Sequence, residues 1–150
     1  MENYRKDVGV SAMVDLNSSN CHVVNEKSNR EFLEQYAKAG RIGLIGGSNW
    51  IHRGVRLGQA LLPEFGRPSL WSHVVVLSGG GQLYESDITI KWQELKLVNG
   101  AQDNPLGKYF DDQKYQYLAI LDFELSDEQT QTVLDACRKM IEFFIRSQAL

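Results

Sequence analysis

SHVVVLSGGGQLYESDITI, from Ser72 to Ile90, begins with a run of β-branched residues and then meets three consecutive glycines. β-branched residues are enriched in strands, and glycine accepts the backbone conformations that tight turns need. A second run of strand-forming residues starts at Gln82, directly after the glycines. The pattern predicts a β-hairpin in which His73 opens one strand and acidic residues lie on the other.

Upstream of this hairpin the sequence predicts two helices and a strand. Ser28 precedes Glu31 at the spacing of a capping box, and Gly40 ends the helix that this box starts. The run RIGLIGG, from Arg41 to Gly47, is short, apolar and bounded by glycines, which favours a buried strand. We expect a second helix after Ser48 or Asn49, closed by the loop from Pro63 to Pro68.

Downstream, a polar stretch from Asn99 to Asp112 is expected to connect the hairpin to the last strand and helix. The strand is YQYLAILDF, from Tyr115 to Phe123. Ser126 and Gln129 form a second capping box at the start of the helix. One face of this helix carries apolar residues at helical spacing: Val133, Leu134, Cys137, Met140, Ile141 and Phe144.

Strands separated by helices, with a hairpin among them, predict an α+β domain whose mainly antiparallel sheet is packed with helices. A length of 150 residues suits a single domain. Residues 1–27 show no sustained period and are interpreted as an N-terminal arm, although Val8 to Leu16 suits a short strand. Residues 28–150 are then expected to form the domain itself.

Composition excludes several classes of protein. The formal net charge is -3, and the basic residues are scattered, so nucleic acid is not an expected partner. No apolar run approaches the length of a membrane span, and the start MENYRKDVGV lacks the apolar core of a signal peptide. The sequence therefore predicts a cytoplasmic or non-classically secreted protein with no transmembrane segment.

The two cysteines, Cys21 and Cys137, lie far apart and show no metal-ligand spacing. Neither a zinc site nor a disulfide framework is indicated. The glycine runs at 46–47 and 79–81 match no phosphate-binding fingerprint and are interpreted as turns. We therefore expect neither a metal nor a cofactor.

Among the residues of this hairpin, His73 is the strongest candidate for a catalytic residue. Facing positions on paired strands bring side chains within roughly 5 Å, so Glu85 or Asp87 on the partner strand can orient the imidazole. A base with an orienting carboxylate makes up two thirds of a catalytic triad. A single histidine at the start of a strand is nevertheless more often structural than catalytic.

The segment SHVVV followed by Tyr84-Glu85 resembles the Ser-His and Glu signature of the NlpC/P60 superfamily, especially its circularly permuted, papain-like YaeF/YiiX group. The order of elements is similar too: GRIGLIGG at 40–47, a helix bearing Val55-Arg56, a loop, and then the Ser-His strand. The resemblance covers roughly Gly40 to Phe144, and its specific part is limited to the Ser-His strand and Glu85. It implies a permuted papain-like topology.

The resemblance implies that His73 is the general base, that Glu85 orients it, and that Trp71 and Ser72 line a substrate cleft. It also implies a cysteine nucleophile after the last helix, at a helix N-terminus where the dipole lowers the thiol pKa. No such cysteine follows within these residues. Either the chain is truncated before that segment, another chain supplies it, or the domain only binds.

The two cysteines present are poor substitutes for this nucleophile. Cys137 falls on the apolar face of the last helix and is interpreted as a core residue. Cys21 precedes His73, as in unpermuted members of the superfamily, but it stands in a strand or loop and is kept only as a weak candidate. His22 beside it is interpreted as a coincidence.

The function that follows from the resemblance is a cysteine-dependent amidase, peptidase or acyl hydrolase. Its substrates would be peptide amides such as those of peptidoglycan, or lipid amides and esters. The alternative is a non-catalytic binding or interaction domain that retains the papain-like fold. An incomplete fold would expose apolar surface, so self-association is also expected.

Overall fold

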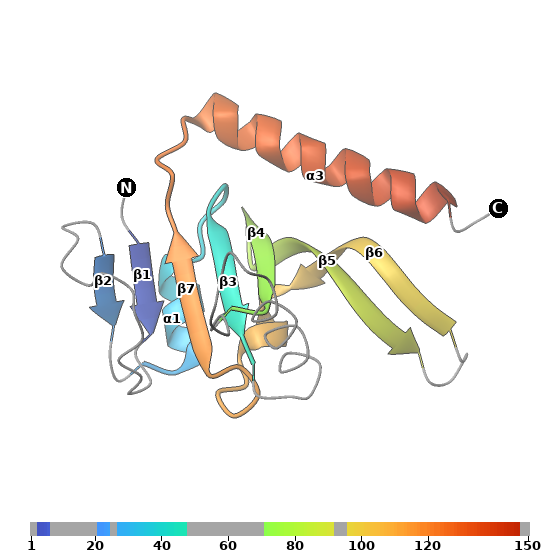
Figure 1. The fold of residues 1–150 in the computed structure, drawn as a ribbon. Coiled ribbons are helices and arrows are strands. Elements are labelled where there is room, and N and C mark those ends of the chain that lie inside the picture. Colours follow the sequence, from blue (N-terminus) through green and yellow to red (C-terminus); the bar gives the residue numbers. More distant parts are fainter. Residues whose placement is uncertain (1–2, 7–20, 25–26, 48–70, 92–95, 148–150) are drawn as a thin grey trace, which may run out of the picture.

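The computed structural model describes residues 3–6, 21–24, 27–47, 71–91 and 96–147, which form one sheet with helices against it (Figure 1). The strands are β1 (Asn3–Lys6), β2 (Cys21–Val24), β3 (Ile42–Gly46), β4 (His73–Gly79), β5 (Gln82–Lys91), β6 (Lys96–Pro105) and β7 (Tyr117–Leu121). The helices are α1 (Asn29–Tyr36), the short 3-10 helix η1 (Leu106–Tyr109) and α3 (Asp127–Ser147).

The described strands pair in the order β2-β1-β7-β3-β4-β5-β6. Strands β3 to β7 are joined by antiparallel pairings, and β1 is also antiparallel to β7. The prediction of an α+β fold with a mainly antiparallel sheet is therefore confirmed. β1 and β2 fall in the predicted N-terminal arm, where they pair in parallel and continue the sheet. The predicted strand from Val8 to Leu16 and the helix after Ser48 lie outside the described residues.

The predicted hairpin is present as β4 and β5. Its turn uses three glycines, Gly79, Gly80 and Gly81, which all have positive φ angles of 81°, 60° and 75°. In the register of this pair Val75 lies opposite Glu85, and Leu77 lies opposite Leu83. Because strand side chains alternate between faces, these four residues point to the same side of the sheet.

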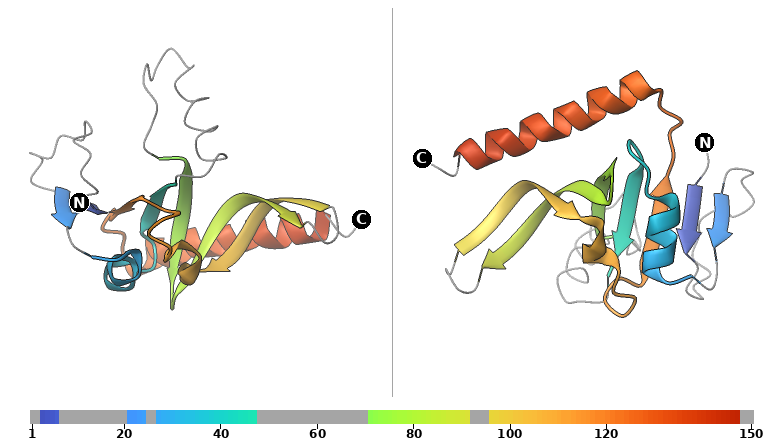
Figure 2. Two further views of the ribbon diagram at one scale, coloured as in Figure 1. Left: turned by 90° about the horizontal axis from the view of Figure 1, so that it is seen from below. Right: turned by 180° about the vertical axis from the view of Figure 1, so that it is seen from behind.

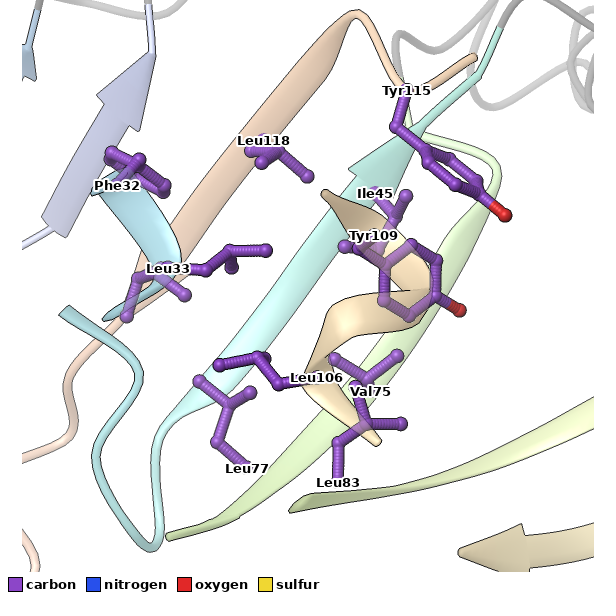
Figure 3. Packing of buried hydrophobic residues seen from close by; sticks show 11 residues of the cluster. Phe32, Leu33, Ile45, Val75, Leu77, Leu83, Leu106, Tyr109, Tyr115 and Leu118 are labelled. Atoms are coloured by element: carbon purple, nitrogen blue, oxygen red, sulfur yellow. The ribbon is translucent and has the colours of Figure 1, made fainter. Parts of the chain in front are cut away.

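That side carries the hydrophobic core, which Figure 3 shows between the strands, α1 and η1. Phe32 and Leu33 of α1 are buried against the sheet, and Leu106 and Tyr109 of η1 are buried beside them. The strands contribute the remaining aliphatic side chains of this cluster: Ile45, Val75, Leu77, Leu83, Leu118 and Ile120. The core face thus extends under β4 and β5, where the site described below lies.

α1 begins at the predicted capping box. The Ser28 side chain accepts a hydrogen bond from the backbone N–H of Glu31, whose carboxylate accepts one from the Ser28 N–H. Asn29 is fully buried behind this cap, and its side-chain amide donates to the carbonyl oxygens of Asp111 and Tyr115. These bonds fix the start of α1 to the segment that leaves η1, so both helices are held over the same core.

The polar stretch from Asn99 to Asp112, in which the sequence analysis assigned neither a strand nor a helix, contains most of β6 and the whole of η1. β6 pairs with β5 along its whole length, from Gln82 opposite Pro105 to Lys91 opposite Lys96. Strand pairing satisfies the backbone whatever the side chains are, and an edge strand can be polar. η1 follows β6 directly and turns back over the core.

α3 begins at the second predicted capping box, in which Ser126 and Gln129 each bind the other's backbone N–H at 2.9 and 3.2 Å. The helix then runs alongside β5 and β6 (Figure 2). Two glycines allow it to approach: a Cβ at Gly40 would lie 2.8 Å from the Thr130 hydroxyl, and one at Gly100 would lie 2.9 Å from the Phe144 ring.

The predicted apolar face of α3 is only partly covered. Leu134 and Ile141 are buried, whereas Met140 keeps 57% of its surface exposed. Within the described ranges, no helix combines the length and the apolar character that crossing a bilayer requires.

Candidate active site

The candidate site is built on the first residue of β4 and the fourth residue of β5. His73 opens β4 opposite Ile45 of β3, and its side chain points to the core face. Glu85 lies opposite Val75, which places it diagonally across from His73 on the same face. The imidazole Nε2 and the Glu85 Oε2 atom are 2.6 Å apart. The expected hydrogen bond is therefore present, and Glu85 rather than Asp87 makes it.

The Glu85 carboxylate receives hydrogen bonds from four different side chains. His73 Nε2 and the Tyr109 hydroxyl contact Oε2. Asn104 Nδ2, at 2.6 Å, and Lys108 Nζ contact Oε1. A carboxylate has about four acceptor positions, so those of Glu85 are all occupied. Its side chain is 0% exposed, and burial of a charge is tolerated only with such partners.

Gln102 lies directly opposite Glu85 on β6. Its Nε2 atom is buried without a hydrogen-bond partner in the described part of the chain. Glu85 cannot accept this further donor, because its acceptor positions are already filled.

The same contacts determine the charge of Glu85. Burial raises the pKa of this carboxyl group, but the hydrogen bonds from His73, Lys108 and Tyr109 outweigh burial and lower the pKa to about 2. The group is therefore ionised at neutral pH. An ionised carboxylate only accepts hydrogen bonds, so the hydrogen between it and His73 must reside on Nε2.

With this hydrogen on Nε2, the other ring nitrogen of His73 is Nδ1, which does not contact Glu85. Within the described residues, the contact with Glu85 is the imidazole's hydrogen bond, and Nδ1 has no protein partner there. The His73 side chain retains 17% exposure, so part of the ring reaches the surface. A neutral imidazole in this tautomer presents the lone pair of Nδ1, which can accept a proton.

Lys108 joins both acidic residues of β5. Its ammonium group contacts Glu85 and lies 2.7 Å from the Asp87 Oδ2 atom. Burial lowers the pKa of Lys108, but the hydrogen bonds and charges of Asp87 and Glu85 outweigh it and raise the pKa. Lys108 therefore stays charged, and it stands between two carboxylates beside one imidazole.

The Tyr109 hydroxyl donates a buried hydrogen bond to the Glu85 carboxylate. Burial and the charge of Glu85 both raise the pKa of its hydroxyl, so the group stays protonated and acts as a donor. The ring packs edge-on against Tyr115 with centroids 4.7 Å apart, and it lies 6.4 Å from the His73 ring. Figure 3 shows the Tyr109 ring in the same buried cluster as Ile45 and Val75, and its hydroxyl donates to Glu85.

Three of the four partners of Glu85 come from the segment that the sequence interpretation left as a connection. Asn104 belongs to β6, and Lys108 and Tyr109 belong to η1. The only available signal was the run Leu106 to Phe110, where apolar and aromatic residues interrupt the polar stretch. Their contact with Glu85 depends on the pairing of β5 with β6, which spacing alone does not reveal.

The two residues predicted to line a cleft precede His73. The Ser72 hydroxyl donates to the Ile45 carbonyl oxygen at 3.3 Å, and the Ser72 N–H donates to the same oxygen at 3.0 Å. Ser72 thus anchors the start of β4 to β3. Trp71 is partly buried. Their role in a cleft stays a prediction.

Neither cysteine is brought to His73. Cys21 is in β2, and three strands separate β2 from β4, which corresponds to roughly 19 Å across the sheet at the usual strand spacing. Cys137 is in α3, and burial raises the pKa of its thiol. The structure therefore brings His73 and Glu85 together, with Asp87 nearby through Lys108, and leaves the weak nucleophile candidate Cys21 remote.

No group of three or more histidine, cysteine, aspartate or glutamate side chains in the described residues is arranged to hold a metal ion. No protein-family model, curated protein or solved structure matches the chain significantly.

Proposed function

We propose that this domain supplies the general base of a cysteine-dependent hydrolase that cleaves amides or esters. The observation that supports the proposal is the 2.6 Å contact between His73 Nε2 and the buried, ionised Glu85. A base oriented by a carboxylate is the arrangement that activates a nucleophile in acyl transfer. The resemblance to permuted NlpC/P60 hydrolases points to the same two residues.

The surroundings of Glu85 favour a positioning role over an incidental ion pair. Surface pairs are held loosely and contribute little, whereas Glu85 is fully buried and bound by four donors. These donors leave the carboxylate one orientation, and the carboxylate in turn fixes the imidazole. A ring fixed in this way presents the same nitrogen to any group that approaches its exposed edge.

In the proposed reaction, Nδ1 of His73 removes the proton of a cysteine thiol, and the thiolate attacks the substrate carbonyl carbon. The tetrahedral intermediate collapses when the imidazolium returns this proton to the leaving amine or alcohol, and a thioester remains. Water then attacks the thioester while Nδ1 accepts its proton, and the proton finally passes to the departing thiolate. The products are a carboxylic acid, the amine or alcohol, and the free thiol.

The two ring nitrogens of this histidine exchange the roles they have in a serine-protease triad. There the acid binds Nδ1 and Nε2 acts as the base. Here Glu85 binds Nε2, so the reacting nitrogen is Nδ1. The nucleophile must therefore approach the edge of the ring that faces away from the carboxylate.

The proposal requires a thiol from outside these 150 residues, since Cys21 and Cys137 are both unsuitable. A polypeptide segment that follows α3, or a partner chain, would supply it. The substrate classes are those of the resemblance: peptide amides such as those of peptidoglycan, or lipid amides and esters.

The base assignment can be tested on the chain itself. p-Nitrophenyl acetate is incubated with a small thiol, cysteamine, and with the wild-type chain or His73→Ala. We expect the chain to accelerate nitrophenolate release and His73→Ala to lose this acceleration. His22→Ala is the matched control, because it removes an imidazole from β2, which three intervening strands separate from β4. Equal rates for wild type and His73→Ala would contradict the assignment.

A second assay uses the polypeptide that includes the cysteine-bearing segment. Hydrolysis of a peptide amide or an N-acyl amine should fall by about 10²–10⁴-fold in His73→Ala, the usual contribution of a general base. An unchanged turnover of that variant would refute the proposed function.

The second candidate is a non-catalytic binding domain. It is favoured by one specific observation, namely that no thiol of the described residues lies near His73. Under this alternative the His73 and Glu85 pair only stabilises the hairpin, and neither assay above would show activity in the wild type.

A further inference from the structure

α3 carries two apolar stripes, of which one is buried against the sheet and the other is not. Leu134 and Ile141 belong to the buried stripe, and Phe144 continues it over Gly100. The second stripe, called the exposed stripe below, consists of Val133, Ala136, Met140 and Phe143. Met140 and Phe143 keep 57% and 69% of their surface exposed, so the described part of the chain leaves this stripe largely uncovered.

The spacing of the exposed stripe is the one by which two helices pack along a common seam. Its residues follow one another at intervals of three, four and three positions, which puts them in one line on the helix. The Phe143 ring also lies edge-on against the Phe144 ring, with centroids 6.0 Å apart. An aromatic side chain that is already held in place loses little freedom on binding, which suits it to the centre of an interface.

The charges of α3 favour a particular partner helix. Residues 127–136 include three acidic and no basic side chains, whereas residues 137–147 include three basic side chains and one acidic. At 3.6 residues per turn, four of these charges fall along one flank of the exposed stripe: Glu128, Asp135, Lys139 and Arg146. This flank is therefore acidic towards the start of α3 and basic towards its end.

A second copy of α3 that runs antiparallel to the first covers the exposed stripe completely. A two-fold axis near residues 137–138 sets Val133 opposite Phe143 of the second copy, and Ala136 opposite its Met140. The symmetry repeats each contact in the reverse direction, so one stripe covers the other. Each large side chain then faces a smaller one, which lets the two helices approach closely.

The same placement brings opposite charges together. Glu128 comes level with Arg146 of the second copy, and Asp135 comes level with its Lys139. In a parallel pair each acidic residue would instead face its own copy, which is unfavourable. One antiparallel arrangement thus satisfies both the apolar spacing and the charges.

We propose that the chain forms a homodimer through antiparallel packing of α3 against α3. The dimer surface consists of the exposed stripe and its charged flank: Glu128, Val133, Asp135, Ala136, Lys139, Met140, Phe143 and Arg146. The sequence alone predicted self-association without a surface, and the structure assigns it to this one. The proposal goes beyond the hydrolase function and does not depend on it.

Sedimentation equilibrium of the chain, up to millimolar concentrations, measures the dissociation constant of the dimer. We expect the wild type to dimerise and Phe143→Glu to raise the dissociation constant at least about tenfold, because the seam would then bury a charge. Ile145→Glu is the matched control. Ile145 is exposed by 65%, much as Phe143 is, but it lies on nearly the opposite side of the helix, so this variant should dimerise like the wild type.

Two charge variants test the antiparallel direction. Glu128→Lys and Arg146→Glu each place like charges together at both ends of the dimer, so each should raise the dissociation constant about threefold to tenfold at low salt. An equimolar mixture of the two variants forms heterodimers with opposite charges at both ends, and its dissociation constant should return to about the wild-type value. A parallel pair has like charges together already in the wild type, so neither variant alone would weaken it.

A wild-type chain that stays monomeric at millimolar concentrations would overturn the proposal. Equal weakening by Phe143→Glu and Ile145→Glu, or a dimer that Phe143→Glu leaves intact, would also overturn it, because the contact would then lie elsewhere. Single charge variants that dimerise like the wild type would refute the antiparallel arrangement. His73→Ala should dimerise normally, so the dimer and the proposed hydrolase function can fail separately.

Discussion

On the core side of the sheet, α1 and η1 bury Phe32, Leu33 and Leu106 to 6% exposure or less, whereas the C-terminal half of α3 leaves Met140 and Phe143 exposed by 57% and 69%. Both regions consist of helices packed against the same sheet. The tightly packed side is also the side that carries His73 and Glu85, so the candidate site lies on the hydrophobic core. The α3 side is joined to the sheet by separate contacts, such as Phe144 over Gly100 and Arg138 with Tyr84.

The core side should therefore carry the largest share of stability. Phe32→Ala should lower the free energy of unfolding by about 3–5 kcal/mol, because Phe32 is fully buried and its removal leaves a cavity. Urea unfolding followed by circular dichroism measures the change. A loss no larger than that of an exposed substitution on α3 would show that this core does not hold the fold.

Acid should weaken the core side through Glu85. Its pKa is lowered from 4.5 to about 2, so the stability it contributes is complete above pH 4.5 and is lost as the pH falls through about 2. The loss amounts to at most about 3 kcal/mol. Urea unfolding at several pH values checks this.

Glu85→Gln is the matched control for the acid experiment, since it cannot ionise. Its stability should lack the decline that Glu85 causes between pH 4.5 and about 2. An identical pH dependence in both proteins would show that Glu85 does not titrate as its contacts imply.

Tyr109→Phe tests one polar contact without disturbing the packing. It removes the hydroxyl that donates to Glu85 and should cost about 2 kcal/mol, the usual range for a hydrogen bond to a charged group. The ring contacts with Tyr115 remain, so the near-ultraviolet circular dichroism spectrum should keep its shape. A neutral effect on stability would mean that water replaces the hydroxyl.

The smallest effect is expected on α3. Met140→Ser should change the free energy of unfolding by no more than about 0.5 kcal/mol, because its side chain is largely exposed. Sedimentation at increasing concentrations of both proteins would also test the predicted self-association. A large loss of stability in dilute solution would show that this part of α3 is covered by other parts of the protein.

The elements that sequence reasoning predicted correctly are those whose signals are local. The capping boxes at Ser28 and Ser126 depend on residues three positions apart, and the hairpin at Gly79 depends on a turn that glycine permits. β6 escaped prediction because its polar residues and Gly100 lack the alternation of a half-buried strand. Its backbone is satisfied by pairing with β5, which is a tertiary effect.

The candidate site was also predictable only in its local part. His73 and Glu85 lie on the two strands of one hairpin, so their proximity followed from the register of neighbouring strands. Asn104 approaches Glu85 from β6, and Lys108 and Tyr109 approach it from η1, so the chain returns to Glu85 through two later elements. Spacing in the sequence does not encode that return.

The full occupation of Glu85 has a consequence for how this site can vary. Replacing any one of its four donors would open an acceptor position inside the protein, where only water or a foreign cation could fill it. Such a change is tolerable when a second substitution closes the gap, so we expect variation among His73, Asn104, Lys108 and Tyr109 to be correlated. Variation at the exposed positions of α3 outside the dimer surface has no such constraint and should accumulate one residue at a time.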